Sequence, residues 1–198
     1  MKIFKKIALI IALSSALFAT DIALIKTVSP QDATGEVAKV YQEINATWKS
    51  IPNPIKLYST NPQMLKNKFE SYKLSGAHES VDGKFQTMIR MLVSKQHDCE
   101  YCVGLNEGML INMFKVPVKD VMAMKKDPSL SPLPEKEKAL LLFVLKATSD
   151  SKSTTKEDIE NLRKLGWNDG EIFFATSYAA DMVAFDILIN AFKVQVDY

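Results

Sequence analysis

Two cysteines separated by two residues are the side chains of this sequence best suited to chemistry. Cys99 and Cys102 are its only cysteines among 198 residues, so neither can bridge to a distant segment. A disulfide between them would close a very short loop, which adds little stability to a fold. Two thiols at this spacing share one face of a helix and can alternate between dithiol and disulfide. The spacing therefore predicts redox chemistry rather than structural cross-linking.

The residues just before the pair predict how it is activated. Asp98 is a favourable N-cap, so we expect a helix over residues 98–114 with Cys99 in its first turn. Free backbone N–H groups and the helix dipole favour a thiolate there. The second sulfur, Cys102, can then resolve a sulfenic acid or a mixed disulfide. His97 titrates in the range of a base and is an auxiliary candidate, although a lone loop histidine commonly has no special role.

Other uses of a CxxC pair fit this sequence less well. Haem attachment requires His directly after the second cysteine, and that residue is Val103. A closed zinc site requires two further ligands, and the only histidines, His78 and His97, lie at spacings that match no common zinc pattern. We therefore expect neither a metal nor a cofactor.

The first 19 residues have the three parts of a secretory signal peptide. Three lysines among the first six residues precede an apolar run over residues 7–18, and Ala19 offers a small residue for cleavage. The run is short for a bilayer span. We expect cleavage, no stable membrane insertion afterwards and a periplasmic protein, with an uncleaved anchor as the alternative. Disulfides persist in that compartment, so an oxidised but idle pair also stays open.

The charge balance argues against nucleic acid as a partner. The sequence contains 25 Lys and Arg and 23 Asp and Glu. Residues 1–19 include three of the lysines and no acid, so residues 20–198 carry 22 basic and 23 acidic side chains, a net charge of −1. Such a chain has no basic surplus to neutralise phosphates. Its 179 residues are enough for one domain with a sizeable core.

Helical periodicity extends through most of the chain, and strand-like alternation is scarce. We predict an all-α fold, a compact bundle of about seven helices, with the pair at the start of one of them. Ser29-Pro30, Asn61-Pro62 and Asn168-Asp169 are start signals, and Gly166 is a stop signal. The predicted segments are residues 30–48, 61–72, 84–96, 98–114, 135–149, 154–165 and 168–194, with a short helix over 118–124.

The sequence VSKQHDCEYC, which ends at Cys102, resembles the carboxymuconolactone decarboxylase superfamily. The closest branch is its alkyl hydroperoxide reductase D-like, peroxidase-related group. Residues 133–139 and a final helix containing Ala184-Phe185-Asp186 are also similar, and the resemblance covers residues 22–194. It implies an all-helical protein that assembles as a trimer or higher homo-oligomer. It also implies a peroxide or disulfide substrate and a thiol reductant protein as partner.

This sequence departs from the family's motif at two positions. The family has a Glu one helix before the CxxC pair and a His four positions after the second Cys, and here these are Thr87 and Asn106. Neither takes up a proton at neutral pH, although Asn106 can form hydrogen bonds beside the pair. The resemblance favours Cys102 as the attacking thiol, whereas helix-end electrostatics favour Cys99.

Three functions are therefore compared. The first is an exported dithiol/disulfide oxidoreductase with peroxide-reducing activity, and the second is a non-catalytic binding or scaffold protein with a degenerate proton relay. The third, the decarboxylase chemistry that gives the superfamily its name, gains nothing from a CxxC pair and ranks last.

Overall fold

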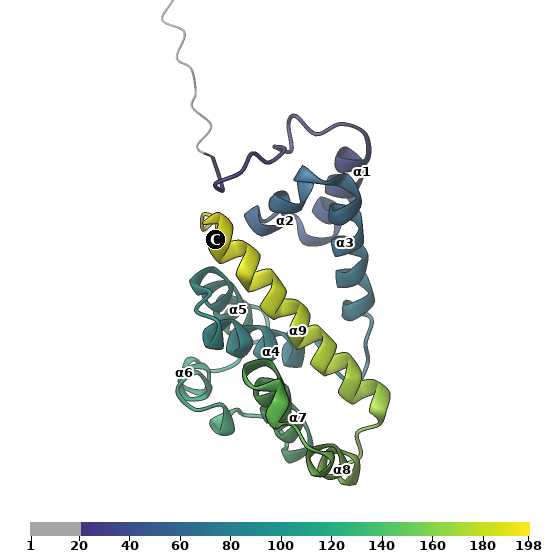
Figure 1. The fold of residues 1–198 in the computed structure, drawn as a ribbon. Coiled ribbons are helices and arrows are strands. Elements are labelled where there is room, and N and C mark those ends of the chain that lie inside the picture. The colour runs from purple at the N-terminus through teal and green to yellow at the C-terminus, as the bar shows by residue number, and fades with distance from the viewer. Residues whose placement is uncertain (1–20) are drawn as a thin grey trace, which may run out of the picture.

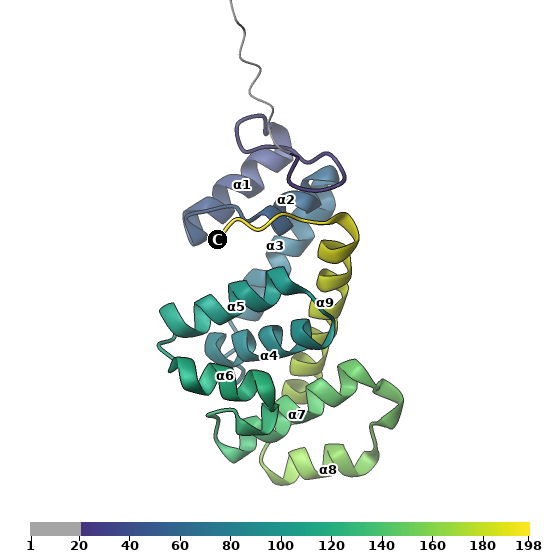
Figure 2. The ribbon, with the colours of Figure 1, turned by 90° about the vertical axis from the view of Figure 1, so that its left-hand side faces the viewer.

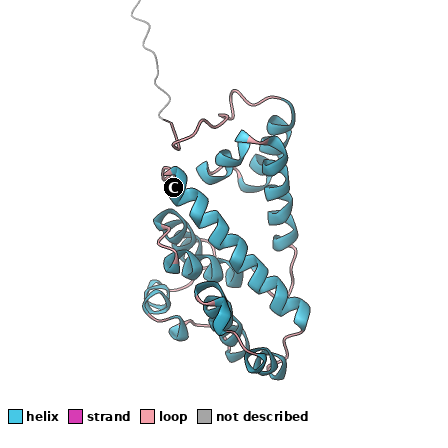
Figure 3. Ribbon diagram, in the orientation of Figure 1, coloured by secondary structure: helices cyan, strands magenta, loops and turns pink. Residues whose placement is uncertain are grey.

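The structure, a computed structural model, describes residues 21–198, so the predicted signal peptide lies outside the described residues. This part of the chain contains nine α-helices and three short 3-10 helices and no strand (Figure 3). The α-helices are α1 (Gly35–Trp48), α2 (Asn53–Leu57), α3 (Pro62–Gly76), α4 (Gly83–Gln96), α5 (Glu100–Asn112), α6 (Val118–Lys126), α7 (Glu135–Ser149), α8 (Lys156–Lys164) and α9 (Asp169–Phe192). The all-α prediction is confirmed. The predicted number of about seven is too low, because the short segment after Pro52, α2, forms a helix of its own and the predicted short helix over 118–124, α6, adds another.

The helices lie in three tiers, with α1–α3 at one end, α4–α6 in the middle and α7–α8 at the other end (Figure 2). Helix α9 runs diagonally past all three tiers (Figure 1). It contacts α4 and α7, and α4 in turn packs against α5. By length and composition α9 alone among the described helices is suited to cross a membrane, a property that core helices of soluble proteins share. In this fold α9 connects the tiers.

Several predicted helix starts are confirmed, because the capping side chain reaches its N–H group. Asn61 accepts hydrogen bonds from the second and third residues of its helix, and Thr155 and Asn168 each form a capping box. The predicted start at Ser29 is wrong. The Ser29 hydroxyl donates to Asp32 (2.7 Å) and closes a local turn, so α1 begins only at Gly35.

The core is densest along α4, which is apolar on most of its circumference. Its fully or almost fully buried apolar side chains are Phe85, Met88, Ile89, Met91, Leu92 and Val93. Because α4 is enclosed by α5, α7 and α9, the turn after its last residue is held where three helices meet. That turn carries the cysteines.

Candidate functional site

A sharp turn between α4 and α5 positions the two cysteines. Asp98 has a left-handed backbone (φ 52°), and the Cys99 N–H donates to the Ser94 carbonyl oxygen (2.9 Å). Cys99 is therefore the N-cap of α5, and its own carbonyl accepts the first helical hydrogen bond from Val103 (3.0 Å). The prediction that Asp98 caps this helix is wrong by one residue, since the left-handed turn at Asp98 places the helix start after it.

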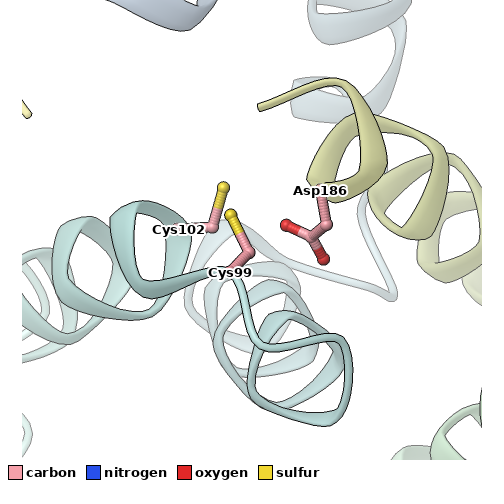
Figure 4. A group of neighbouring side chains, drawn as sticks. All are labelled: Cys99, Cys102 and Asp186. Carbon is pink, nitrogen blue, oxygen red and sulfur yellow. The ribbon is translucent and has the colours of Figure 1, made fainter. Parts of the chain in front are cut away.

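Both thiols are free, buried and close to one carboxylate. Cys99 and Cys102 form no disulfide, and their exposed fractions are 0% and 2%. The two sulfurs and a carboxylate oxygen of Asp186, on α9, all lie within 4.8 Å of one another (Figure 4). Asp186 has an exposed fraction of 0%. The structure thus brings a buried acid to the predicted dithiol.

Only one oxygen of this carboxylate has an assigned partner. The Ser94 hydroxyl donates to Asp186 Oδ1 (2.9 Å), whereas Oδ2 is buried and has no hydrogen-bond partner among residues 21–198. Burial raises the pKa of Asp186, and contacts with the thiols and the Ser94 hydroxyl counter part of this rise. A carboxyl group in this state is suited to take up a proton.

The surroundings of Cys102 favour the protonated form of its thiol. Its neighbour Cys99, then burial, then the charge of Asp186 raise the pKa of Cys102 far above the ordinary value. A thiolate at Cys102 would add a second negative charge to that of Asp186 in a buried position, which would be costly. The predicted activation by helix-start electrostatics concerned Cys99 alone and stays a prediction.

The same three side chains are the group best placed to ligate a metal within residues 21–198. They supply two sulfurs and one oxygen, one ligand more than the sequence alone revealed. A closed zinc site has four ligands, and no further His, Cys, Asp or Glu belongs to the group. The arrangement falls one ligand short of such a site.

His97 lies beside this group and is not a member of it. Its Nε2 atom is buried without a hydrogen-bond partner in the described part of the chain, and its carbonyl accepts from Asn190 of α9 (3.3 Å). Its charge is among the influences that lower the pKa of Asp186. Its auxiliary role remains a prediction.

The two positions that depart from the family motif lie on either side of one arginine. Arg90 donates from Nε to Asn106 Oδ1 (2.7 Å), from Nη2 to Thr87 Oγ1 (2.7 Å) and from Nη1 to the Tyr178 hydroxyl. Asn106 donates in turn to the carbonyl oxygen of Cys102 (2.7 Å). Thr87 and Asn106 are both buried. In place of an acid and a base, this side of the site has a cation bound by neutral acceptors.

The last residues of the chain lie against the first turns of α5, close to the pair. The Tyr198 hydroxyl donates to the Tyr101 carbonyl (3.1 Å), and the Tyr101 hydroxyl donates to Asp197 Oδ1 (2.6 Å). Tyr198 lies against Gly104, where a Cβ atom would overlap its hydroxyl. Burial raises the pKa of Tyr198, and the nearby Cys102 and Cys99 raise it further. Residues 197 and 198 therefore lie against the first turns of α5, with Tyr198 itself largely exposed.

Solved structures with similar folds place this arrangement among known proteins. An uncharacterized peroxidase-related protein from Ralstonia eutropha JMP134, described as an alkylhydroperoxidase AhpD core, matches with a TM-score of 0.78 and 18% identity over 89% of this chain and 93% of its own. A peroxidase-related protein from Silicibacter sp. TM1040 gives 0.74 and 18% over 90% and 91%. The debrominase Bmp8 gives 0.69 and 18% over 90% and 92%.

The chain has an AhpD-like fold. The resemblance that the sequence indicated is thereby confirmed for the fold, and the solved structures that share it are peroxidase-related proteins and a debrominase. No model of a known protein family matches the sequence, and no curated protein does. At 18% identity the AhpD-like fold does not by itself assign an activity.

Sequence reasoning did not identify two side chains of this site, Asp186 and Arg90. Asp186 stands in a long apolar helix, and a buried acid in such a segment is an unusual feature that could have drawn attention to it. Arg90 also lies in an apolar helix, in a chain with only two arginines. Their partners come from distant parts of the chain, so the sequence did not show what either one contacts.

Proposed function

We propose that this AhpD-like protein is an exported CxxC dithiol/disulfide oxidoreductase that reduces peroxides. One observation carries the proposal: two free, buried thiols and a buried carboxylate lie within 4.8 Å of one another. The sulfurs are close enough to form a disulfide after a small rearrangement. The carboxylate supplies the proton acceptor that Thr87 and Asn106 do not.

The proposed cycle uses both sulfurs. The Cys99 sulfur attacks the terminal oxygen of a hydroperoxide, the O–O bond breaks, and a sulfenic acid and an alcohol form. Cys102 then attacks the Cys99 sulfur, the disulfide forms, and hydroxide departs as water. The two thiol protons end on the alcohol and the water. A partner dithiol afterwards returns two electrons and two protons.

Asp186 has the role of proton acceptor in this scheme. Transfer of a proton from a thiol to the carboxylate moves a charge within the buried group and adds none, so the cost of a second buried charge is avoided. The unpartnered Oδ2 atom is the acceptor. Ser94 orients the carboxyl group through its hydrogen bond to Oδ1.

Cys99 is the proposed attacking sulfur. It stands at the N-terminal end of α5, where the helix dipole stabilises a thiolate. The surroundings of Cys102, which raise its pKa, suit it to act in the second step. This order is the reverse of the one that the family resemblance implied.

Two single variants and their combination test the function. Peroxide consumption, supplied with an excess of a small dithiol, is expected to stop in Cys99→Ser and in the double variant. In Cys102→Ser, one equivalent of peroxide is expected to leave a sulfenic acid on Cys99, detectable by mass after trapping with a 1,3-diketone. Unchanged consumption in the double variant would refute the redox assignment. A trapped sulfenic acid on Cys102 in Cys99→Ser would reverse the order of attack.

A non-catalytic binding role is the second candidate. It is favoured by the neutral pair Thr87 and Asn106 and by the small exposure of the thiols. The purified wild-type protein distinguishes the two. A protein that consumes no peroxide, and whose thiols react with an aromatic disulfide reagent no faster than ordinary buried thiols, would be assigned to this class.

Export and assembly complete the proposal. Residues 1–19 support secretion through the inner membrane, and the family resemblance supports a homo-oligomer of three or more subunits. Periplasmic fractionation, with a mature chain that starts after Ala19, is the expected result. Recovery of the uncleaved chain with the membranes would point to an anchored protein.

A further inference from the structure

The two arginines of this chain occupy opposite environments. Arg163 is on the surface and binds both oxygens of Asp169 (2.8 and 2.9 Å) and Oε1 of Glu160 (2.7 Å). Arg90 is partly buried and binds only neutral groups, the side chains of Asn106, Thr87 and Tyr178. Two acidic side chains pair with the exposed Arg163, whereas the less exposed Arg90 pairs with neutral side chains.

No acidic side chain of this chain compensates the charge of Arg90. None forms an ion pair with it among residues 21–198, and residues 1–20 contain no Asp or Glu. A cation withdrawn from water without a counter-ion is costly. The guanidinium has five N–H donors; three meet oxygen acceptors, a fourth meets the Met109 sulfur, and one is left available. These observations point to an anion that the chain itself does not supply.

The uncompensated charge lies next to the dithiol. Asn106 links Arg90 to the backbone of Cys102, since it accepts a hydrogen bond from Arg90 and donates one to the Cys102 carbonyl (both 2.7 Å). Burial raises the pKa of Tyr72 most, while the charge of Arg90 lowers it and that of Cys102 raises it, so Tyr72 lies within electrostatic reach of both. An anion at Arg90 would therefore stand within one small molecule's length of the sulfurs.

The surroundings of Arg90 are aromatic and apolar as well as polar. Its guanidinium carbon lies 6.0 Å from the centre of the Tyr178 ring, which stacks on Phe174 (6.0 Å between centroids). The Met109 sulfur is 4.0 Å from Nη2. A planar guanidinium with apolar neighbours suits a carboxylate joined to a hydrocarbon body.

We propose that Arg90 is the anion-binding group of a substrate site, and that the preferred peroxides are organic hydroperoxides that carry a carboxylate. The part of this inference that concerns peroxides rests on the proposed function. The binding of a carboxylate at Arg90 does not depend on it. Thr87 and Asn106 then serve to orient the guanidinium.

A matched pair of substrates tests the preference. Linoleic acid hydroperoxide and its methyl ester differ only in the charge of the carboxyl group. The wild-type ratio of kcat/KM, acid to ester, is expected to exceed about 10, the effect of one hydrogen-bonded charge pair. In Arg90→Gln the ratio is expected to fall by at least about tenfold. A wild-type ratio near one, or an unchanged ratio in Arg90→Gln, would overturn the proposal.

Two further variants keep the test decisive. Thr87→Asp places a carboxylate against Arg90 Nη2, where the Thr87 hydroxyl now lies at 2.7 Å. Because this carboxylate would pair with Arg90 in place of the substrate, it is expected to lower the acid-to-ester ratio as strongly as Arg90→Gln does. It carries the test if Arg90→Gln does not fold. Arg163→Gln removes the other arginine at the surface and is expected to leave the ratio unchanged.

Binding without turnover separates this inference from the peroxidase proposal. In the double variant Cys99→Ser/Cys102→Ser, linoleic acid itself is the probe, and calorimetry is expected to show tighter binding of the acid than of its methyl ester. Adding Arg90→Gln is expected to weaken acid binding at least about tenfold. If the wild type consumes no peroxide and this difference persists, the anion site stands and the peroxidase proposal fails. If acid and ester bind equally, the anion site fails whatever the outcome for peroxide.

Discussion

The two sides of the dithiol differ in charge and in the chemistry that they can support. On the α9 side, Asp186 is a buried acid with one oxygen unpartnered. On the α4 side, Arg90 is a cation whose oxygen partners are all neutral. Proton transfer is therefore possible on one side and anion binding on the other. The positions where a proton relay was expected, Thr87 and Asn106, belong to the side that binds the cation.

The separation of the two charges matters for both roles. A guanidinium in contact with Asp186 would lower the pKa of this carboxyl and reduce its ability to take up a proton. The same contact would occupy the guanidinium and remove its attraction for a substrate anion. Because Arg90 has no acidic partner, Asp186 keeps its raised pKa and Arg90 keeps its free charge. Proton uptake by Asp186 and anion binding by Arg90 both depend on the separation of the two charges.

The largest expected effect comes from removing the acid. Asp186→Asn keeps the size of the side chain and an acceptor for Ser94, but it abolishes proton uptake. We expect peroxide turnover to fall by about 10²-fold or more, the usual contribution of a general base. Single-turnover measurements of disulfide formation check this, because they exclude the reductant step.

Asp181 provides the matched control for this substitution. It lies on the same helix, is exposed and pairs with Lys68 (2.8 Å), whose own side chain is mostly buried. Asp181→Asn is expected to leave turnover unchanged. Equal losses in the two variants would mean that α9 is being disturbed as a whole and that Asp186 has no special role.

How much of this could be predicted from the sequence differs between the two sides. The cysteine pair and the all-α fold were predictable, since local periodicity and spacing determine them. The pairing of Ser94 with Asp186 joins residues 92 positions apart, and the bond from Arg90 to Tyr178 spans 88. Contacts of that range depend on the packing of α9 against α4, which no local pattern specifies. The helix start was misplaced at Asp98 for a local reason, because a left-handed non-glycine residue is seldom predictable.

Thr87→Asp sharpens the comparison by transferring an acid to the basic side. The new carboxylate is expected to pair with Arg90 and to lower the kcat/KM for carboxylate-bearing hydroperoxides by about tenfold. The methyl ester of the same hydroperoxide measures whatever general damage the substitution causes. A larger loss for the ester than for the acid would contradict the assignment of Arg90 as the anion-binding group.

A smaller effect is expected from opening the α5 side. Gly104→Ala places a Cβ atom against Tyr198 and is expected to displace residues 197 and 198, so that an aromatic disulfide reagent reacts with the thiols a few times faster. Gly108→Ala, on the same helix, meets nothing closer than 4.0 Å and is the matched control. Alanine should stabilise the helix at position 108 by about 0.5–1 kcal/mol without changing thiol reactivity. Equal reactivity in both variants would show that Tyr198 does not limit access.

The smallest expected effect is on the pH dependence of stability. The folded pKa of Asp186 is raised above its unfolded value of about 3.9, so the folded state binds more protons than the unfolded state between these two values. Stability from this group is therefore present at acid pH and is lost as the pH rises through the folded pKa. Urea unfolding of wild type and Asp186→Asn from pH 4 to 8 checks this. The variant should gain stability relative to wild type across that range, and a constant difference would mean that Asp186 is ionised throughout and unable to accept the thiol proton.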